Sequence, residues 1–150
     1  MKTAIVFGAT SGIGKEISEL LLKDGYKVAI TGRRLEKLEA LKNQYSNQVY
    51  IAQNDIQKVD EVEKVFNDIL EEFTTIDLII QSSGVGYINP TLAWSMEEET
   101  IHTNVVGVTK LYDLSFNLFR KQGFGHLVGI TSIASIRGNR GAPAYFSSKA

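Results

Sequence analysis

Cysteine is absent from this chain of 150 residues, and only two histidines, His102 and His126, are present. The first absence excludes a disulfide framework and a thiolate metal site, and with so few histidines we expect no histidine-based metal site. The chain also lacks any apolar run near the roughly 20 residues that a membrane-spanning helix requires. Met1-Lys2 leads directly into the first apolar stretch, so we expect no signal peptide and a cytoplasmic protein.

An excess of charge of either sign is lacking as well. Lysine and arginine number 16 against 17 aspartate and glutamate, which gives a formal net charge of −1. A nucleic-acid or other polyanion partner is therefore not expected, because such partners are bound by strongly basic surfaces. The length suits a single domain over residues 1–150 with a sizeable core, and we expect its partner to be a small molecule rather than nucleic acid or a membrane.

What the chain does have is the glycine-rich segment Gly8-Ala9-Thr10-Ser11-Gly12-Ile13-Gly14. An apolar stretch typical of a buried strand precedes it, and apolar residues at helical spacing follow it. Such a turn offers free backbone N–H groups and the positive end of a helix dipole to an anion. Gly8 permits the tight turn, Gly12 the approach of a pyrophosphate, and Gly14 close packing of helix on strand.

The spacing of these glycines differs from the more common G-x-G-x-x-G pattern. It does not form a P-loop, because Glu16 follows Lys15 where a magnesium-binding serine or threonine is required. A plain glycine-rich turn without a ligand is the alternative when this stretch is taken alone.

Strands alternate with helices along the whole chain. The expected strands are residues 3–7, 26–31, 49–52, 77–80 and 126–130, with helices starting near residues 13, 35 and 59, a loop over 85–95 and a long helix over 96–122. This alternation predicts an α/β fold with a doubly wound parallel sheet, the Rossmann fold, in three α/β/α layers with strand order 3-2-1-4-5. Ligands then bind outside the carboxyl ends of the first and fourth strands.

Near the end of the chain, Tyr145 and Lys149 stand at i and i+4 and share one face of a helix. A free tyrosine has a pKa of about 10, and a nearby lysine cation favours its phenolate form. Ser132 follows the fifth expected strand, where its hydroxyl can hold a carbonyl oxygen while Tyr145 donates a proton. Taken without Ser132, the tyrosine and lysine are better interpreted as an exposed pair on a helix surface.

Together these motifs resemble the short-chain dehydrogenase/reductase family. The matching features, in chain order, are the Gly8–Gly14 turn, Asp55 after the third strand, Asn104 in the long helix, Ser132, and Tyr145 with Lys149. The resemblance implies that Tyr145 is the general acid or base, that Lys149 lowers the pKa of Tyr145 and binds the nicotinamide ribose, and that Ser132 orients the substrate oxygen.

The resemblance also implies roles for two polar residues in the middle of the chain. Asn104 would distort its helix locally and hold a water of a proton relay, and Asp55 would contact the adenine amino group. Judged as residues alone, Asn104 is also compatible with a polar side chain bonded across a helix kink, and Asp55 with a cap of the next helix.

The end of the second strand indicates the cofactor. NAD-specific relatives carry an acidic residue there, bonded to the ribose 2′-OH. Here Gly32 occupies that place and Arg33 follows, and a guanidinium pairs well with a 2′-phosphate, so we expect NADP(H), with help from Arg34. Exposed residues at a helix start are the alternative for both arginines. The predicted cofactor-binding set is Gly8, Thr10, Ser11, Gly12, Ile13, Gly14, Arg33, Arg34, Asp55, Ile56, Ser82, Gly84, Tyr145 and Lys149.

Three features depart from the family pattern. Phe7 replaces the usual threonine before the first glycine, and Gln81-Ser82-Ser83-Gly84 replaces Asn-Asn-Ala-Gly, so the contacts that brace the fourth strand must differ. The chain also ends at Ala150, whereas family members continue. We therefore expect residues 1–150 to be part of a longer native domain, marginally stable or inactive alone, with the edge of the fifth strand unpaired. The full-length form is expected to be a homo-oligomer, a dimer or tetramer.

The sequence thus favours an NADP(H)-dependent oxidoreductase that interconverts a carbonyl compound and a secondary alcohol by hydride transfer. The alternative is a non-catalytic NADP-binding module or an inactive fragment. Tyr87, in the 85–95 loop, is a candidate for lining the substrate pocket. Trp94, in the same loop, and His102, in the long helix, are expected to be packing or surface residues.

Overall fold

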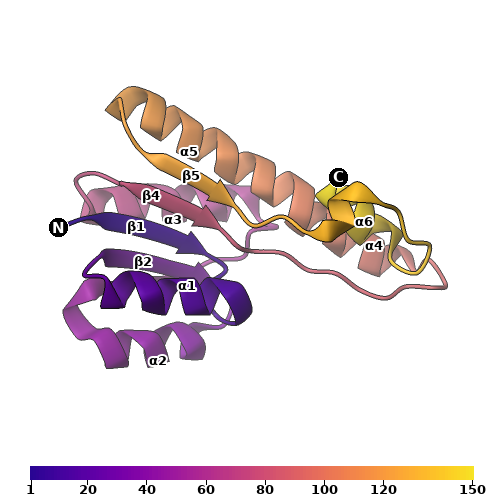
Figure 1. Ribbon diagram of the computed structural model, residues 1–150, viewed down its shortest axis with the longest axis horizontal. Coiled ribbons are helices and arrows are strands. Elements are labelled where there is room, and N and C mark those ends of the chain that lie inside the picture. Colours follow the sequence, from indigo (N-terminus) through magenta and orange to yellow (C-terminus); the bar gives the residue numbers. More distant parts are fainter.

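Five parallel strands form one sheet in the order β3-β2-β1-β4-β5 in the computed structural model, which describes residues 1–150 (Figure 1). This is the predicted order, and the predicted Rossmann-type fold class is confirmed. The strands are β1 (Thr3–Phe7), β2 (Lys27–Gly32), β3 (Val49–Gln53), β4 (Leu78–Gln81) and β5 (His126–Gly129). Every neighbouring pair is parallel, so all five carboxyl ends meet at one edge of the sheet.

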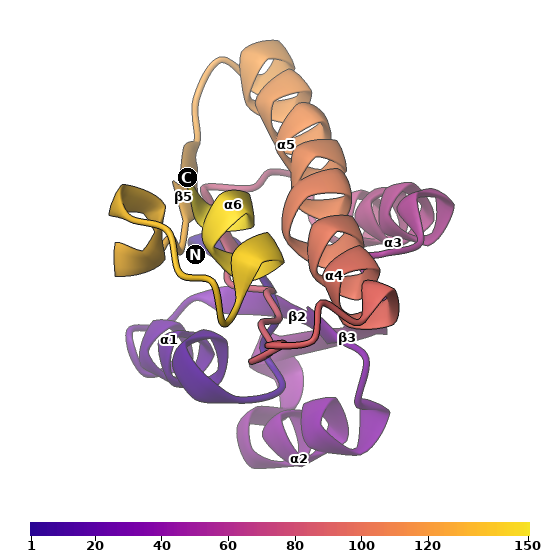
Figure 2. The same ribbon diagram turned by 90° about the vertical axis from the view of Figure 1, so that its right-hand side faces the viewer.

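Helices cover both faces of the sheet (Figure 2). In chain order the helical elements are α1 (Gly12–Lys23), α2 (Leu35–Tyr45), the short η1 (Ser46–Gln48), α3 (Val59–Glu72), α4 (Trp94–Ile101), η2 (His102–Gly107), α5 (Val108–Gln122), η3 (Ile133–Ile136) and α6 (Pro143–Lys149). The helices α1 and α2 pack on one face, and α3 and α5 pack on the other. No helix is both long and apolar enough to cross a membrane.

The central strand β1 is buried on both faces, because successive side chains of a strand point to opposite sides. Ile5 and Phe7 join the cluster under α3 and α5, whereas Ala4 and Val6 join the cluster under α1 and α2. Phe7, which stands where the family pattern has threonine, stacks on Phe66 with ring centroids 6.5 Å apart. Two-sided packing thus fixes the end of β1, from which the glycine-rich turn emerges.

The long helix predicted over 96–122 begins earlier, at Trp94, and is not one continuous α-helix. Its middle, η2, is π-helical, and it separates α4 from α5. At Gly107 a side chain would collide with the backbone carbonyl of Ile56, which shows how closely η2 approaches the end of β3. The predicted loop is correspondingly shorter and ends at Ala93. Trp94 and His102 are surface residues.

Candidate functional site

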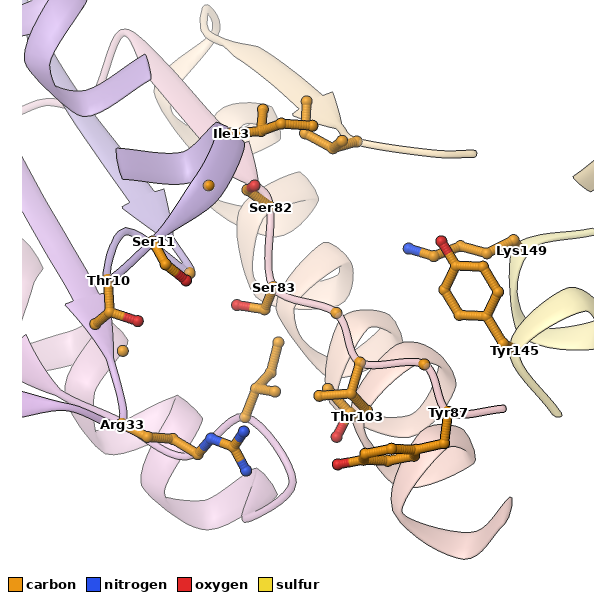
Figure 3. A pocket seen from close by; sticks show the side chains of 18 of the residues that line it. Thr10, Ser11, Ile13, Arg33, Ser82, Ser83, Tyr87, Thr103, Tyr145 and Lys149 are labelled. Carbon is orange, nitrogen blue, oxygen red and sulfur yellow. The ribbon is translucent and has the colours of Figure 1, made fainter. Parts of the chain in front are cut away.

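A cleft of about 1000 Å³ opens at the carboxyl edge of the sheet. The turns after all five strands and the inner face of α6 line it (Figure 3). The whole predicted cofactor-binding set lies along this cleft except Gly14, and Tyr87 lines it too, as expected. Distant segments are therefore brought to one cavity, with the glycine-rich turn at one end and α6 at the other.

The conformation of the turn between β1 and α1 requires residues without side chains. Gly8 and Gly12 have φ angles of 87° and 54°, in the left-handed region that favours glycine. A Cβ at Gly8 would lie 2.6 Å from the Ser83 backbone nitrogen, and a Cβ at Gly14 would collide with the Gly8 carbonyl oxygen. Gly14 therefore allows α1 to pack directly on the turn, with the helix N-terminus facing the cleft.

Two arginines at the end of β2 lie beside this turn. The Arg34 guanidinium donates hydrogen bonds to Thr10 Oγ1 at 2.8 Å and to Ser11 Oγ at 2.6 Å, which ties it to the glycine-rich turn. Arg33 is about half exposed and pairs with Glu99 of α4, with 3.4 Å between Nη1 and Oε1. Both arginines directly follow Gly32, which stands where NAD-specific relatives have an acidic residue. The positive charge of their guanidinium groups suits this end of the cleft to an anion.

Glu99 also bonds the loop after β4. The Tyr87 hydroxyl donates to Glu99 Oε2 at 2.8 Å. This hydrogen bond, assisted by burial, raises the pKa of Tyr87 above its ordinary value. Arg33, Glu99 and Tyr87 thus form a polar bridge from the end of β2 to the loop after β4.

At the other end of the cleft, α6 presents Tyr145 and Lys149 to the cavity, and Figure 3 shows the lysine side chain running alongside the tyrosine ring. Lys149 Nζ lies 5.9 Å from the Tyr145 ring centroid. The chain after β4 passes so close to both that a Cβ at Gly86 would collide with the Tyr145 ring, and one at Gly84 would lie 3.3 Å from Lys149 Nζ. The phenol and the ammonium therefore share one narrow region of the cleft.

Asn104 is buried within η2, so the expected helix distortion is present at this residue. Its Oδ1 accepts the Val85 N–H at 2.9 Å, and its Nδ2 donates to the Val85 carbonyl at 2.7 Å and to Ser148 Oγ at 2.9 Å. Ser148 Oγ in turn donates to the Tyr145 carbonyl at 2.8 Å. Asn104 thus joins the loop after β4 to α6, while its role in holding a water stays a prediction.

Two predicted site residues, Ser132 and Asp55, form hydrogen bonds with nearby backbone N–H groups. Ser132 does not line the cleft, and its Oγ caps η3 by accepting the Ala134 N–H at 3.1 Å. Asp55 lines the cleft, but its Oδ1 also accepts the Gln57 N–H at 3.2 Å within the turn before α3, whose N-cap is Lys58, so Asp55 does not cap that helix. The roles of Ser132 toward a substrate and of Asp55 toward adenine remain predictions.

Two polar residues that the sequence did not single out also line the cleft. Asn54 is 4% exposed and Thr103 is 5% exposed, and neither Asn54 Nδ2 nor Thr103 Oγ1 has a hydrogen-bond partner in the protein. A buried polar atom without a partner costs about 1–3 kcal/mol, so both atoms are suited to a polar ligand. Their only sequence signal is adjacency, since Asn54 precedes Asp55 and Thr103 precedes Asn104.

The segment Gln81-Ser82-Ser83-Gly84, which replaces the family's Asn-Asn-Ala-Gly, makes its own contacts at the end of the fourth strand. Gln81 is buried at the end of β4, and its Nε2 donates to the Ser83 carbonyl at 3.0 Å. The chain therefore braces the turn after β4 with a glutamine, as the departure from Asn-Asn-Ala-Gly required.

A family model described as short chain dehydrogenase matches residues 2–150. The chain belongs to the short-chain dehydrogenase family. It is 30% identical to an uncharacterized oxidoreductase of Staphylococcus aureus strain USA300, covering 99% of this chain and 66% of the relative. It is also 30% identical to an NADP-dependent 3-hydroxy acid dehydrogenase of Escherichia coli O6:H1, covering 97% of this chain and 60% of that protein.

Solved structures of longer dehydrogenases have the same fold. An alcohol dehydrogenase of the archaeon Thermococcus sibiricus complexed with 5-hydroxy-NADP superposes with a TM-score of 0.92 at 29% identity, covering 99% of this chain and 66% of the other. The closed form of a serine dehydrogenase complexed with NADP+ has a TM-score of 0.92 at 28% identity, covering 98% and 60%. The chain thus spans about two thirds or less of the length of these relatives.

The cleft fits a nicotinamide dinucleotide on its own features. The backbone at the start of α1 borders the cleft, and the space around Gly12 is open, as a pyrophosphate held by backbone N–H groups requires. Asn54 and Thr103 offer unpaired polar atoms to a ligand, and Arg33 and Arg34 offer positive charge. The family and the fold together identify a Rossmann-type domain of the short-chain dehydrogenase family.

Proposed function

We propose that residues 1–150 form the cofactor-binding and catalytic part of an NADP(H)-dependent oxidoreductase that interconverts a carbonyl compound and a secondary alcohol. The observation that carries the proposal is the single cleft, which joins the arginine-flanked glycine turn to Tyr145 and Lys149. Relatives support it, because one is an NADP-dependent 3-hydroxy acid dehydrogenase and two solved neighbours are complexed with NADP or its derivative.

In this proposal the phosphate end of the cleft binds and orients. The backbone N–H groups at the start of α1 hold the pyrophosphate, helped by the helix dipole. Arg33 and Arg34 hold the 2′-phosphate, Arg34 already being directed toward Thr10 and Ser11 of the turn. Asp55 and Ile56, at the end of β3, border the adenine end.

The other end moves the proton. A bound nicotinamide supplies or accepts the hydride. The Tyr145 hydroxyl gives a proton to the carbonyl oxygen in reduction and takes it from the alcohol in oxidation. The Lys149 ammonium stabilises the phenolate that remains and binds the nicotinamide ribose. Ser132 keeps its own O–H free to donate to the substrate oxygen, because its Oγ acts only as an acceptor toward Ala134.

A second candidate function is a non-catalytic NADP-binding module. The observation that favours it is that Ser132, which would orient the substrate oxygen, does not line the cleft. Consumption of NADPH with a panel of small ketones and diketones such as 2,3-butanedione separates the two functions. Turnover supports the enzyme, and tight NADPH binding without turnover on any carbonyl supports the module.

The cofactor experiment is a fluorescence titration of NADPH and NADH into the wild type and into the Arg33→Ala and Arg34→Ala variants. We expect NADPH to bind more tightly, and each variant to lose about 1.5–3 kcal/mol of NADPH affinity while NADH affinity changes little. Arg137→Ala is the control, because Arg137 is exposed and lies outside the cleft lining. Equal affinities for both cofactors, or a preference that survives loss of both arginines, would refute the NADP assignment.

A further inference from the structure

Three consecutive glutamates on α4 have three different environments. Glu98 is exposed, and Glu99 pairs with Arg33 and Tyr87. Glu97 instead reaches α6, which begins 46 residues later at Pro143 in the sequence: its Oε2 accepts the Ala144 N–H at 2.9 Å. Its Oε1 accepts Asn89 Nδ2 at 2.6 Å. Neither the cofactor proposal nor the proton-transfer proposal uses Glu97.

The start of α6 has no side-chain acceptor of its own for the free N–H groups of its first turn. The N-cap residue is Ala142, which has no side-chain acceptor, so the first turn has no cap of its own. The N–H groups of a first helical turn have no partner within the helix. A carboxylate that accepts one of them makes a charge-assisted hydrogen bond and interacts favourably with the helix dipole. Glu97 therefore caps α6 from another helix.

Asn89, in the loop after β4, connects this loop to the Glu97 cap. It is 2% exposed, its Oδ1 accepts the Ala93 N–H at 2.9 Å, and its backbone N–H donates to the Gly141 carbonyl at 2.7 Å. Through Glu97 and Asn89, the start of α4 is bonded both to the first turn of α6 and to the segment just before it. The contact is with the turn that carries Tyr145.

We propose that Glu97 is a positioning residue, which sets the place of Tyr145 and Lys149 by capping α6; this inference rests on the proposed function. The helix has 7 residues, and so short a helix requires outside contacts to keep its conformation. Asn104 holds its second turn through Ser148, and Glu97 holds its first turn. Loss of the first contact lets the phenol and the ammonium move together, and a shift of about 1 Å in such a site can reduce activity about a hundredfold.

The contact itself is tested by NMR without any cofactor. In the wild type and in the control Glu98→Ala, we expect the Ala144 amide proton to resonate downfield, because its N–H donates to a charged carboxylate oxygen. In Glu97→Gln we expect a smaller downfield shift, because the amide oxygen is a neutral acceptor, and in Glu97→Ala the signals of residues 143–149 also shift. Unchanged α6 signals in Glu97→Ala would overturn the proposal.

The positioning role is tested by a double-mutant cycle on the NADPH dissociation constant with Lys149→Ala. Glu97→Ala should raise the dissociation constant about tenfold in the wild type and less than about twofold when Lys149 is already absent, because both changes act through the same ammonium. Glu97→Gln should fall between the wild type and Glu97→Ala. Equal losses in both backgrounds, with a matching fall in Tm, would show a purely structural residue and overturn the proposal. A wild type that binds no NADPH would overturn the proposed function, whereas the Ala144 experiment would still decide the contact.

Discussion

The two ends of the cleft are held together by different parts of the chain. The phosphate end, formed by the Gly8–Gly14 turn and the residues after β2 and β3, comes from adjacent βα units in the first part of the chain. Its geometry depends on missing side chains, since a Cβ at Gly8 or Gly14 would meet backbone atoms. The tyrosine end also needs a glycine, since a Cβ at Gly86 would collide with the Tyr145 ring, but its helix is held by side chains: Asn104 bonds Ser148 across 44 residues, and Glu97 bonds Ala144 across 47.

This difference predicts which kind of substitution destabilises each end of the cleft. A close-packed backbone turn is damaged by adding atoms, because nothing around it can move without shifting a strand or a helix. A short helix held by a few polar side chains is damaged by removing atoms, because each lost partner frees the helix and leaves another buried group unpaired. The following variants test this contrast, in order of decreasing expected effect.

Tyr145→Phe separates the chemistry of the tyrosine end from binding at the phosphate end. The ring still packs against Gly86, but the transferable proton is gone, so we expect turnover with NADPH to fall about 10²- to 10⁴-fold. The NADPH dissociation constant should change little. Steady-state rates and fluorescence titration measure the two quantities, and a variant with a near-normal rate would refute the acid–base role of Tyr145.

Gly14→Ala tests the phosphate end by adding one methyl group. The new Cβ would collide with the Gly8 carbonyl, so α1 must shift away from the turn, and we expect the free energy of unfolding to fall by about 1–3 kcal/mol. NADPH affinity should fall as well. The control is Gly138→Ala, because a Cβ there meets nothing within 4 Å. Urea denaturation of both variants measures the effect, and equal stabilities would show that the turn has room to relax.

Asn104→Ala tests the tyrosine end by removing atoms. The change leaves the Val85 N–H and carbonyl without their partner and releases Ser148, so we expect a loss of about 1–3 kcal/mol in the free energy of unfolding. The matched control is Asn117→Ala, whose side chain bonds only the exposed Asp113. If the two alanine variants unfold at the same urea concentration, Asn104 does not hold the loop to α6.

Tyr87→Phe tests the bridge from the loop after β4 to Arg33, and its effect should be the smallest. Because the hydrogen bond to Glu99 raises the pKa of Tyr87, the folded protein favours the neutral phenol. This stability is present below the ordinary tyrosine pKa of about 10 and is lost as the pH rises through the raised folded pKa. The variant should be less stable than the wild type by no more than about 1 kcal/mol at pH 7.

The same measurement above the raised pKa provides the check on Tyr87. There the stability difference between the wild type and Tyr87→Phe should shrink, because the ionised phenol no longer donates to Glu99. A difference that is constant from neutral to alkaline pH would show that packing, and not this hydrogen bond, accounts for the effect.

Much of the fold was predictable from the sequence because it repeats a simple pattern. Apolar stretches such as Thr3–Phe7 alternate with helices, and in parallel sheets both faces are buried, so strand order and the edge that binds ligands follow. The predicted binding residues that lie in turns after strands therefore line the cleft. The helix expected over 96–122 begins two residues earlier, at Trp94, and the distortion expected at Asn104 is its π-helical segment, where Asn104 bonds the backbone of Val85.

Other expectations stay predictions. These include the role of Ser132 toward a substrate, the cytoplasmic location, the homo-oligomeric state of a full-length form, and the low stability or activity of residues 1–150 alone. Thermal unfolding together with NADPH turnover of this chain tests the last of them directly.

The sequence by itself determined the order of the strands, the glycine-rich turn and the presence of Tyr145 and Lys149 on one helix face, because these depend on periodicity and on neighbours a few residues apart. Only the tertiary structure decided which polar groups hold those residues in place. Glu97 on α4, Asn89 in the preceding loop and the unpaired Asn54 and Thr103 carry no local pattern that distinguishes them. A hydrogen bond between residues far apart in the chain has no periodicity to reveal it, since its geometry exists only once both elements have packed on the sheet.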